Sequence, residues 1–369
     1  MSLLFSPIQL GGLTLRNRIA VSPMCQYSAV DGAAQPWHWQ HLGSLALSGA
    51  GVVITEATSV ASEGRISPPD LGLWNDEHQA LLTSLIEDVH SYCDTPFGVQ
   101  LAHAGRKAST ARPWDGVGAV DPAHGGWTPV APTDEPFDET YPLPVALDLA
   151  GIARIRAAFV TAAMRADACG FDLVELHAAH GYLLHEFYSP LSNHRTDTYG
   201  GSFENRVRLA LEIARDVRAV WPRSKALGMR ITGSDWTEGG WTPEDAVRLA
   251  ALLKAEGLDY VCVSSGGVAP KIRIPGREPG YQVPFAAKVK AETGIATMSV
   301  GMIVTAHQAE DILVSGQADM VALARAMLDD PRWALHAAAA LGDEAPYPPQ
   351  YDRAGAKLWP GYARARSGD

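Results

Sequence analysis

The chain has 369 residues, of which 47% are hydrophobic, so it can bury a large core. Its formal net charge is -11, with 30 Lys and Arg against 41 Asp and Glu. This balance disfavours a nucleic-acid-binding surface, because binding to phosphates needs clustered positive charge. The four cysteines form no C-x-x-C pair, which argues against a disulfide framework, a zinc ribbon and an iron–sulfur cluster.

The beginning of the chain, MSLLFSPIQLGGLTLRNRIAV, has no basic region followed by an apolar stretch, so no secretory signal is predicted. The apolar run at 42–54 is interrupted by Ser and Gly and is too short for a membrane span. We therefore expect a cytoplasmic protein with no membrane or nucleic-acid partner.

Eight short apolar runs, rich in Val and Ile, end in polar residues or glycine. They lie at 19–24, 51–57, 97–105, 172–181, 226–233, 259–267, 295–301 and 319–325. They do not alternate strictly between apolar and polar residues, which is typical of strands buried on both faces of a parallel sheet.

Helical patterns separate most of these runs. Apolar residues recur at helical spacing over 152–168, and Thr242 and Thr305 are candidate caps of two later helices. Eight strands alternating with helices predict an α/β fold, a (β/α)8 TIM barrel. A doubly wound open sheet is the alternative, but it usually has fewer strands, and no G-x-G-x-x-G follows the first run.

The pattern predicts a single domain over 1–369 with one long excursion after the third strand. Residues 106–148 are rich in Pro, Gly, Trp and acidic residues and have no clear period, so we expect a lid or subdomain over the barrel mouth. A tail rich in Pro and aromatic residues follows at 345–369.

In such barrels the chemistry lies at the carboxyl ends of the strands, so the polar residues that close each run are site candidates. Glu56 is the only obvious carboxylate among them, which gives little support to hydrolysis by paired carboxylates. The candidates are Pro23, Met24, Cys25, Tyr27, Glu56, Ala57, Thr58, Gln100, His103, His177, His180, Tyr182, Arg230, Ser264, Ser265, Gly301 and Arg325.

A phosphate site is predicted near the end of the barrel. Loops after strands seven and eight commonly bind phosphate through backbone N–H groups. Gly301 allows close backbone approach, and Arg325 can contact a phosphate with two nitrogens.

Four segments together resemble the old yellow enzyme family of FMN-dependent ene-reductases. They are NRIAVSPMCQYSA (17–29), QLAHAGRKA (100–108), HAAHGYLLHEF (177–187) and HRTDTYGGSFENR (194–206). The SPMC segment, Gln100 and the QYDR tail resemble the bacterial subgroup of xenobiotic reductases and thermophilic-type enzymes.

The resemblance implies a TIM barrel with tightly bound FMN at its mouth and NADPH or NADH as reductant. It also implies roles for particular residues of this chain. The implied flavin contacts are Ser22, Pro23, Met24, Cys25, Ala57, Gln100 and Arg230, with Val300, Gly301, Ala324 and Arg325 at the phosphate. The implied substrate contacts are Tyr27, His177, His180, Tyr182 and Trp359, with Arg353 reaching a neighbouring subunit's site.

These residue types suit the implied chemistry. A permanently charged Arg230 stabilises the negative charge of a reduced flavin, and Gln100 offers both a donor and an acceptor to its pyrimidine edge. His177 and His180 hold the substrate oxygen where charge develops, and Tyr182 protonates the α carbon. A zinc site on the two histidines is the alternative, but no third ligand is evident.

Cys25 is open to three interpretations: a nucleophile, a plain buried thiol, or a residue that tunes the flavin, which the resemblance favours. The string from Arg195 to Arg206 is expected to be structural, with a helix capped near Ser202. Ala324 stands where many relatives have Gly, and Val300 where some have Trp.

We expect an enzyme that reduces the C=C bond of α,β-unsaturated carbonyl or nitro compounds by a ping-pong mechanism. A flavin-binding redox sensor and a zinc-dependent TIM-barrel hydrolase are the alternatives. The larger dienoyl-CoA reductase and amine dehydrogenase branch is disfavoured by the chain length and by the scattered cysteines. Arg353 suggests a homodimer or homotetramer.

Overall fold

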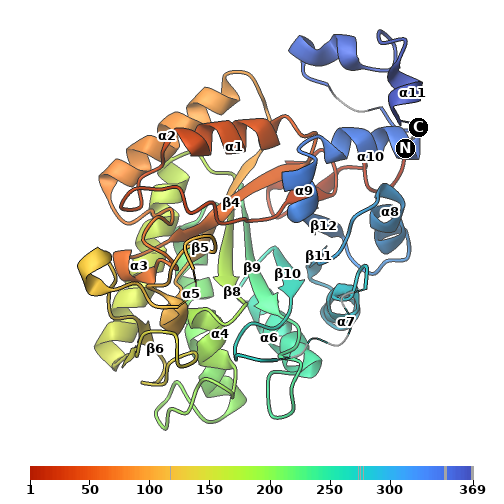
Figure 1. Cartoon of the computed structure of the whole chain (residues 1–369). Helices are drawn as coiled ribbons and strands as arrows, with labels where there is room; N and C mark the ends of the chain where they lie inside the picture. Colours follow the sequence, from red (N-terminus) through yellow and green to blue (C-terminus); the bar gives the residue numbers. More distant parts are fainter. Residues whose placement is uncertain (117, 273, 275, 277, 345–346, 367–369) are drawn as a thin grey trace.

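The computed structural model describes residues 1–116, 118–272, 274, 276, 278–344 and 347–366. Within this part of the chain, eight parallel strands close into a barrel in the order β10-β11-β12-β3-β4-β5-β8-β9 (Figure 1). The TIM barrel predicted from the alternating pattern is confirmed. The strands are β3 (Ile19–Val21), β4 (Val52–Ser59), β5 (Phe97–Ala102), β8 (Leu173–Ala178), β9 (Ala226–Thr232), β10 (Tyr260–Ser264), β11 (Ala296–Val300) and β12 (Met320–Leu323).

A helix follows each barrel strand and covers its outer face. These helices are α1 (Pro36–Ala46), α2 (Asp76–His90), α3 (Leu149–Ala168), α5 (Phe203–Val220), α6 (Pro243–Ala255), α7 (Val283–Thr293), α8 (Ala306–Val314) and α10 (Trp333–Leu341). The side chains of Ser202, Thr242 and Thr305 cap α5, α6 and α8 by accepting a backbone N–H three residues on, as predicted.

Shorter elements interrupt this regular order. Three are helices: α4 (Leu183–Tyr188) after β8, α9 (Arg325–Asp329) after β12, and α11 (Tyr362–Arg366) in the tail. The pairs β1 (Ile8–Leu10) with β2 (Leu13–Leu15), and β6 (Val130–Ala131) with β7 (Val145–Ala146), form two small sheets. Among the described residues, 3₁₀ turns lie at Ser62–Gly64, Gly105–Lys107, Pro122–His124 and Pro349–Ala354.

The barrel interior is apolar at one end and polar at the other. Leu10 and Leu15 of the β1–β2 hairpin pack with inward-facing strand residues such as Ile54, Leu173 and Met298, and so close the amino-terminal end. Side chains alternate along a strand, so the next inward positions towards the carboxyl end lie one layer higher. On β5, β8 and β9 these positions hold polar residues, and the candidate site is built there.

Candidate active site

A buried cation and its partners form the floor of the site. Arg230 on β9 donates from Nη2 to Ser22 Oγ at 2.8 Å, and its Nε lies 3.3 Å from Glu175 Oε1. Gln100 on β5 donates to the same carboxylate oxygen at 2.7 Å. All four side chains are buried, so the structure brings together three of the predicted flavin contacts.

Glu175 belongs to this floor but is not among the residues predicted from the sequence, where Glu56 is the only carboxylate among the strand-end candidates. A carboxylate that follows the apolar residues Leu173 and Val174 in the strand LVELHA was the available signal, because buried charges are nearly always paired. Glu56 lies at a register shift of β4, where its carboxylate accepts the Gln26 N–H and pairs with His38. It therefore holds the loop that carries Cys25 and Tyr27.

The two predicted histidines are in direct contact at the mouth of the barrel. His180 Nδ1 lies 3.4 Å from His177 Nε2, and His180 Nε2 lies 2.7 Å from Ser264 Oγ. The Ala179 N–H donates to His177 Nδ1 at 3.2 Å, which places the proton of a neutral His177 on Nε2, facing His180.

Both imidazoles are held neutral. Burial lowers the pKa of His177 and of His180 well below the usual histidine value, and the nearby charges of Arg230 and Lys107 lower both further. Each ring therefore donates one hydrogen bond and accepts another at neutral pH, which suits binding of a neutral oxygen that gains charge during reaction.

The backbone that presents these groups is unusual. His180 has a φ of +61° and Gly181 a φ of +73°, and a side chain at position 181 would collide with the backbone of Gly267. Lys107 donates to the carbonyl oxygens of His180 at 2.8 Å and Gly267 at 3.1 Å, and His185 accepts the Gly181 N–H at 2.8 Å. Such strained turns persist where surrounding contacts hold them, and they cluster at functional sites.

Tyr182 follows this turn and packs beside the histidines. Its ring centroid lies 5.0 Å from that of His177, and the Lys107 ammonium lies 4.9 Å from the Tyr182 ring centroid. Burial raises the pKa of Tyr182 well above its usual value, and the neighbouring Cys25 and Tyr27 raise it further. The phenol therefore carries its proton at neutral pH.

Cys25 and Tyr27 lie in the loop after β3, close enough to Tyr182 to affect its pKa. Burial, followed by the nearby carboxyl groups of Asp70 and Glu56, raises the pKa of Cys25 well above its usual value, so the thiol stays protonated and the nucleophile interpretation loses support. Tyr27, with a φ of +51°, packs edge-on against Trp114 of the excursion at 5.6 Å between ring centroids.

The predicted phosphate residues lie at the ends of β11 and β12. Gly301 has a φ of +111°, and a side chain there would collide with Gln282, whose amide donates to the Val300 carbonyl at 2.9 Å. The guanidinium of Arg325 is exposed and forms no ion pair with any residue that the structure describes. Ala324 precedes it at the start of α9.

These residues fit the cofactor that the resemblance implies. The floor offers a cation, a hydroxyl and an amide, which match the polar edge of a flavin. In the described part of the chain, by contrast, no group of three or more His, Cys, Asp or Glu side chains is arranged to hold a metal ion.

The excursion packs over the turn between β8 and α4 (Figure 1). Arg195 pairs with Asp197, in line with the predicted structural role of this string. Arg195 Nη1 also donates to the carbonyl oxygens of Pro132 and Leu147, which ties the excursion to the barrel, a contact that was not predicted. The predicted lid range 106–148 includes residue 117, which lies outside the described residues.

The tail lies away from the site of its own chain. Figure 1 shows α11 and α10 at the end of the molecule opposite α4. Trp359 packs on Tyr362 at 6.3 Å between ring centroids, and Arg353 is exposed. The structure does not bring these two predicted substrate contacts to the other site residues, and the contact of Arg353 with a neighbouring subunit's site stays a prediction. Residues 345, 346 and 367–369 of the predicted tail lie outside the described residues.

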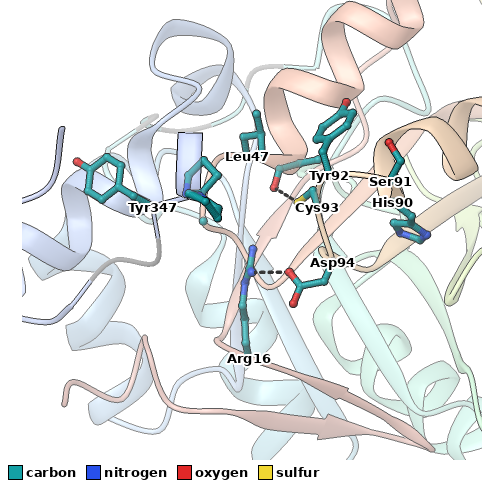
Figure 2. Close-up of a pocket in the computed structure, with 12 residues that line it drawn as sticks. Arg16, Leu47, His90, Ser91, Tyr92, Cys93, Asp94 and Tyr347 are labelled. Carbon is teal, nitrogen blue, oxygen red and sulfur yellow. Dashed lines mark hydrogen bonds and ion pairs between the residues drawn. The ribbon is translucent and has the colours of Figure 1, made fainter. Parts of the chain in front are cut away.

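A separate pocket of about 500 Å³ lies beside the start of the tail (Figure 2). Its lining includes Tyr347 and the loop before β5, where Cys93 donates to the Ala46 carbonyl at 3.2 Å, and Arg16 pairs with Asp94 at 3.3 Å. This pocket is at the amino-terminal end of the strands and contains none of the predicted site residues.

Comparison with known proteins supports the implied chemistry. Residues 3–344 match the model of the NADH:flavin oxidoreductase / NADH oxidase family. The chain is 45% identical over 353 residues to an NADPH dehydrogenase of Bacillus pumilus, covering 95% of this chain and 98% of that protein. It is 44% identical to an NADPH dehydrogenase of a Geobacillus species, with 95% and 98% covered.

Solved structures show the same fold. Morphinone reductase in complex with tetrahydroNAD superposes with a TM-score of 0.76 at 27% identity, over 94% of this chain and 93% of that one. A 2-naphthoyl-CoA reductase superposes with a TM-score of 0.81 at 22% identity, over 99% of this chain but 58% of that one, and this likeness concerns the fold alone.

None of the helices in the described residues is long and apolar enough to cross a membrane.

Proposed function

The chain belongs to the NADH:flavin oxidoreductase / NADH oxidase family, and we propose that within it the protein is an FMN-dependent NAD(P)H:alkene oxidoreductase. Its substrates are α,β-unsaturated carbonyl or nitro compounds. The observation that carries the proposal is the contact between His177 and His180 beside Tyr182, directly above the buried pair of Arg230 and Glu175.

We assign the cofactor contacts by the chemistry of each group. Arg230, Ser22 and Gln100 hold the pyrimidine edge, and Pro23, Met24, Cys25 and Ala57 line the adjoining wall. Val300, Gly301, Ala324 and Arg325 hold the phosphate. FMN held by these residues would supply the hydride chemistry that amino-acid side chains lack, with NADPH or NADH as the reductant and the β carbon of the alkene as the hydride acceptor.

The histidine pair binds the oxygen of the substrate. Because both rings are neutral, the pair supplies N–H donors to the substrate oxygen without adding a permanent charge to the site. As the alkene is reduced, negative charge builds on that oxygen, and donors already in place stabilise it. Tyr27 closes the substrate pocket from the opposite side.

Tyr182 supplies the proton. Its phenol is protonated at neutral pH, and its ring lies 5.0 Å from that of His177, one of the two groups that bind the oxygen. General acid catalysis of this kind typically contributes about 10²–10⁴-fold to a rate. Since the nicotinamide and the alkene use one site in turn, ping-pong kinetics follow.

The visible spectrum of the purified protein, recorded anaerobically, tests this function. We expect a flavin band that bleaches on addition of NADPH and returns on addition of 2-cyclohexenone. A band that bleaches but does not return would favour the redox-sensor alternative. Absence of any bound flavin after reconstitution with FMN would contradict the proposal, and metal analysis would then test the zinc alternative.

We further propose that the protein is a homodimer or homotetramer in which Arg353 and Trp359 approach the active site of a neighbouring subunit. The support is that both lie on an outlying tail, away from the site of their own chain. Size-exclusion chromatography with light scattering tests the assembly. An Arg353→Ala variant should raise KM for the enone if the contact exists, and should leave FMN content unchanged.

A further inference from the structure

Glu175 is a charged residue in the barrel interior to which the proposed reaction gives no role. Its side chain is fully buried and lies on β8, between Gln100 of β5 and Arg230 of β9. Oε1 accepts the Gln100 amide at 2.7 Å and lies 3.3 Å from Arg230 Nε, while Oε2 accepts the Tyr260 hydroxyl at 3.2 Å. One carboxylate therefore contacts two of the three side chains assigned to the pyrimidine edge of the flavin.

The neighbouring strands are built to accommodate this carboxylate. Glu175 is in register with Gly228 of β9, and Gly228 is in register with Tyr260 of β10. A Cβ at position 228 would lie 2.2 Å from the Tyr260 ring, so only glycine leaves room for the tyrosine that donates to Glu175. Gly228 thus leaves the space in which Tyr260 donates a hydrogen bond to the second carboxylate oxygen of Glu175.

The charge of the cluster also depends on Glu175. Burial raises the pKa of Cys262 to about 12 and the pKa of Tyr260 well above its usual value, so both neighbours are neutral. The remaining charges are those of Arg230 and Glu175, and they cancel. Without Glu175, Arg230 would present an unbalanced positive charge to the flavin in a buried environment, where charges interact strongly.

We infer that Glu175 is a positioning residue that holds Arg230 and Gln100 against the pyrimidine edge of FMN and, by offsetting the charge of Arg230, keeps the reduction potential of the bound flavin low. This inference rests on the proposed function, because it needs FMN at this site. A low potential favours delivery of hydride to the alkene over retention of electrons on the cofactor.

The test is the reduction potential of FMN bound to a Glu175→Gln variant, measured by equilibration with redox dyes. The amide oxygen can still accept from Gln100, but the negative charge is lost. We expect the potential to rise above that of the wild type and FMN to bind several-fold more weakly. An unchanged potential in a variant that retains FMN would overturn the inference.

Glu212→Gln is a matched control. Glu212 also accepts a tyrosine hydroxyl, Tyr199 at 2.9 Å, and also pairs with an arginine, Arg156 at 3.0 Å, but it lies on α5 outside the barrel. Its replacement should leave the potential and the FMN affinity unchanged. A rise of equal size in this control would mean that the effect of Glu175→Gln is not local, and would also overturn the inference.

Tyr260→Phe is the second variant, for use if Glu175→Gln does not fold. It removes a hydrogen-bond donor but leaves the carboxylate, whose uncompensated negative charge increases, so the potential should fall, opposite in sign to Glu175→Gln. An unchanged or raised potential in Tyr260→Phe would overturn the inference. Failure of the wild-type protein to bind FMN would instead refute the proposed function and is distinguishable from these results.

Discussion

At the scale of single residues, protonation states decide what the site can do. Burial keeps His177 and His180 neutral and Tyr182 protonated, so at pH 7 the site holds two neutral imidazoles and one phenol that can donate a proton. The pKa of each histidine is lowered and the pKa of Tyr182 is raised, and both shifts have one cause: burial disfavours the charged form of all three groups.

Replacement of Tyr182 by Phe removes the proposed acid and little else. We expect reoxidation of the reduced protein by 2-cyclohexenone to slow by about 10²–10⁴-fold, the usual contribution of a general acid. Reduction by NADPH should change little, since that step needs no proton from Tyr182. Stopped-flow measurement of the two half-reactions separates these effects, and equal slowing of both would refute the role of the phenol.

Asp70 gives a pH-dependent stability that can be measured. Its carboxyl accepts the N–H groups of Ile66 and Ser67, and burial, followed by the charge of Glu56, raises its pKa to about 8. Between the ordinary pKa of Asp and about 8, the unfolded chain loses this proton while the folded chain keeps it. Asp70 therefore contributes stability at low pH that is lost as the pH rises towards 8.

An Asp70→Asn variant should reveal this loss. We expect the free energy of unfolding of the wild type, relative to the variant, to fall steadily between pH 5 and pH 8 in urea titrations. The exposed Asp94, replaced by Asn, should show a much flatter difference over the same range. A difference for Asp70→Asn that stays constant with pH would contradict the raised pKa.

At the scale of elements, the turn between β8 and α4 sets the geometry of the site. The left-handed residues His180 and Gly181 are held from three directions, by Lys107 of the excursion, by the backbone of Gly267 after β10, and by His185 of α4. His185 pairs in turn with the buried Asp235 at 3.0 Å. The geometry of the histidine pair is therefore a property of several elements and not of the HAAH segment alone.

Replacement of Lys107 by Met should loosen this turn. Two half-buried carbonyl groups would lose their donor, at a cost of at most about 1–3 kcal/mol each if left unsatisfied. We expect lower stability in urea unfolding and a higher KM for the enone. Lys254, an exposed lysine that donates to the Thr293 carbonyl at 2.8 Å, is the control, and its replacement by Met should change both quantities little. Equal effects of the two variants would contradict the clamping role.

At the scale of the whole molecule, the barrel leaves a polar floor and mouth that FMN would cover. Binding of a ligand only to the folded state stabilises it by about 2.7 kcal/mol when the ligand is present at 100 times its Kd. Removal of FMN should therefore lower the melting temperature, and its addition should restore it.

The phosphate site makes this prediction specific. FMN should raise the melting temperature more than riboflavin does at equal concentration, because riboflavin lacks the phosphate. Arg325 is exposed, so an Arg325→Ala variant should fold normally and should lose much of the advantage of FMN while its response to riboflavin is unchanged. Identical responses of the variant and the wild type to FMN would remove Arg325 from the phosphate site.

The sequence alone predicted the barrel and the residues that face its mouth. Runs rich in Val and Ile alternate with helical patterns, and parallel strands in that order have few ways to pack other than a closed barrel. Because side chains at strand ends must emerge at one end of such a barrel, Gln100, His177 and Arg230 were expected to lie together, and they do.

Only the tertiary structure decided which of these groups touch. Glu175 and Arg230 pair across two strands, and Lys107 reaches His180 across 73 positions of the chain. Contacts between inward-facing side chains depend on strand register and on the path of long loops, and hydrophobic runs specify neither. The tail shows the same limit, since the resemblance implied Trp359 as a substrate contact, whereas the tail that carries it packs away from the site of its own chain.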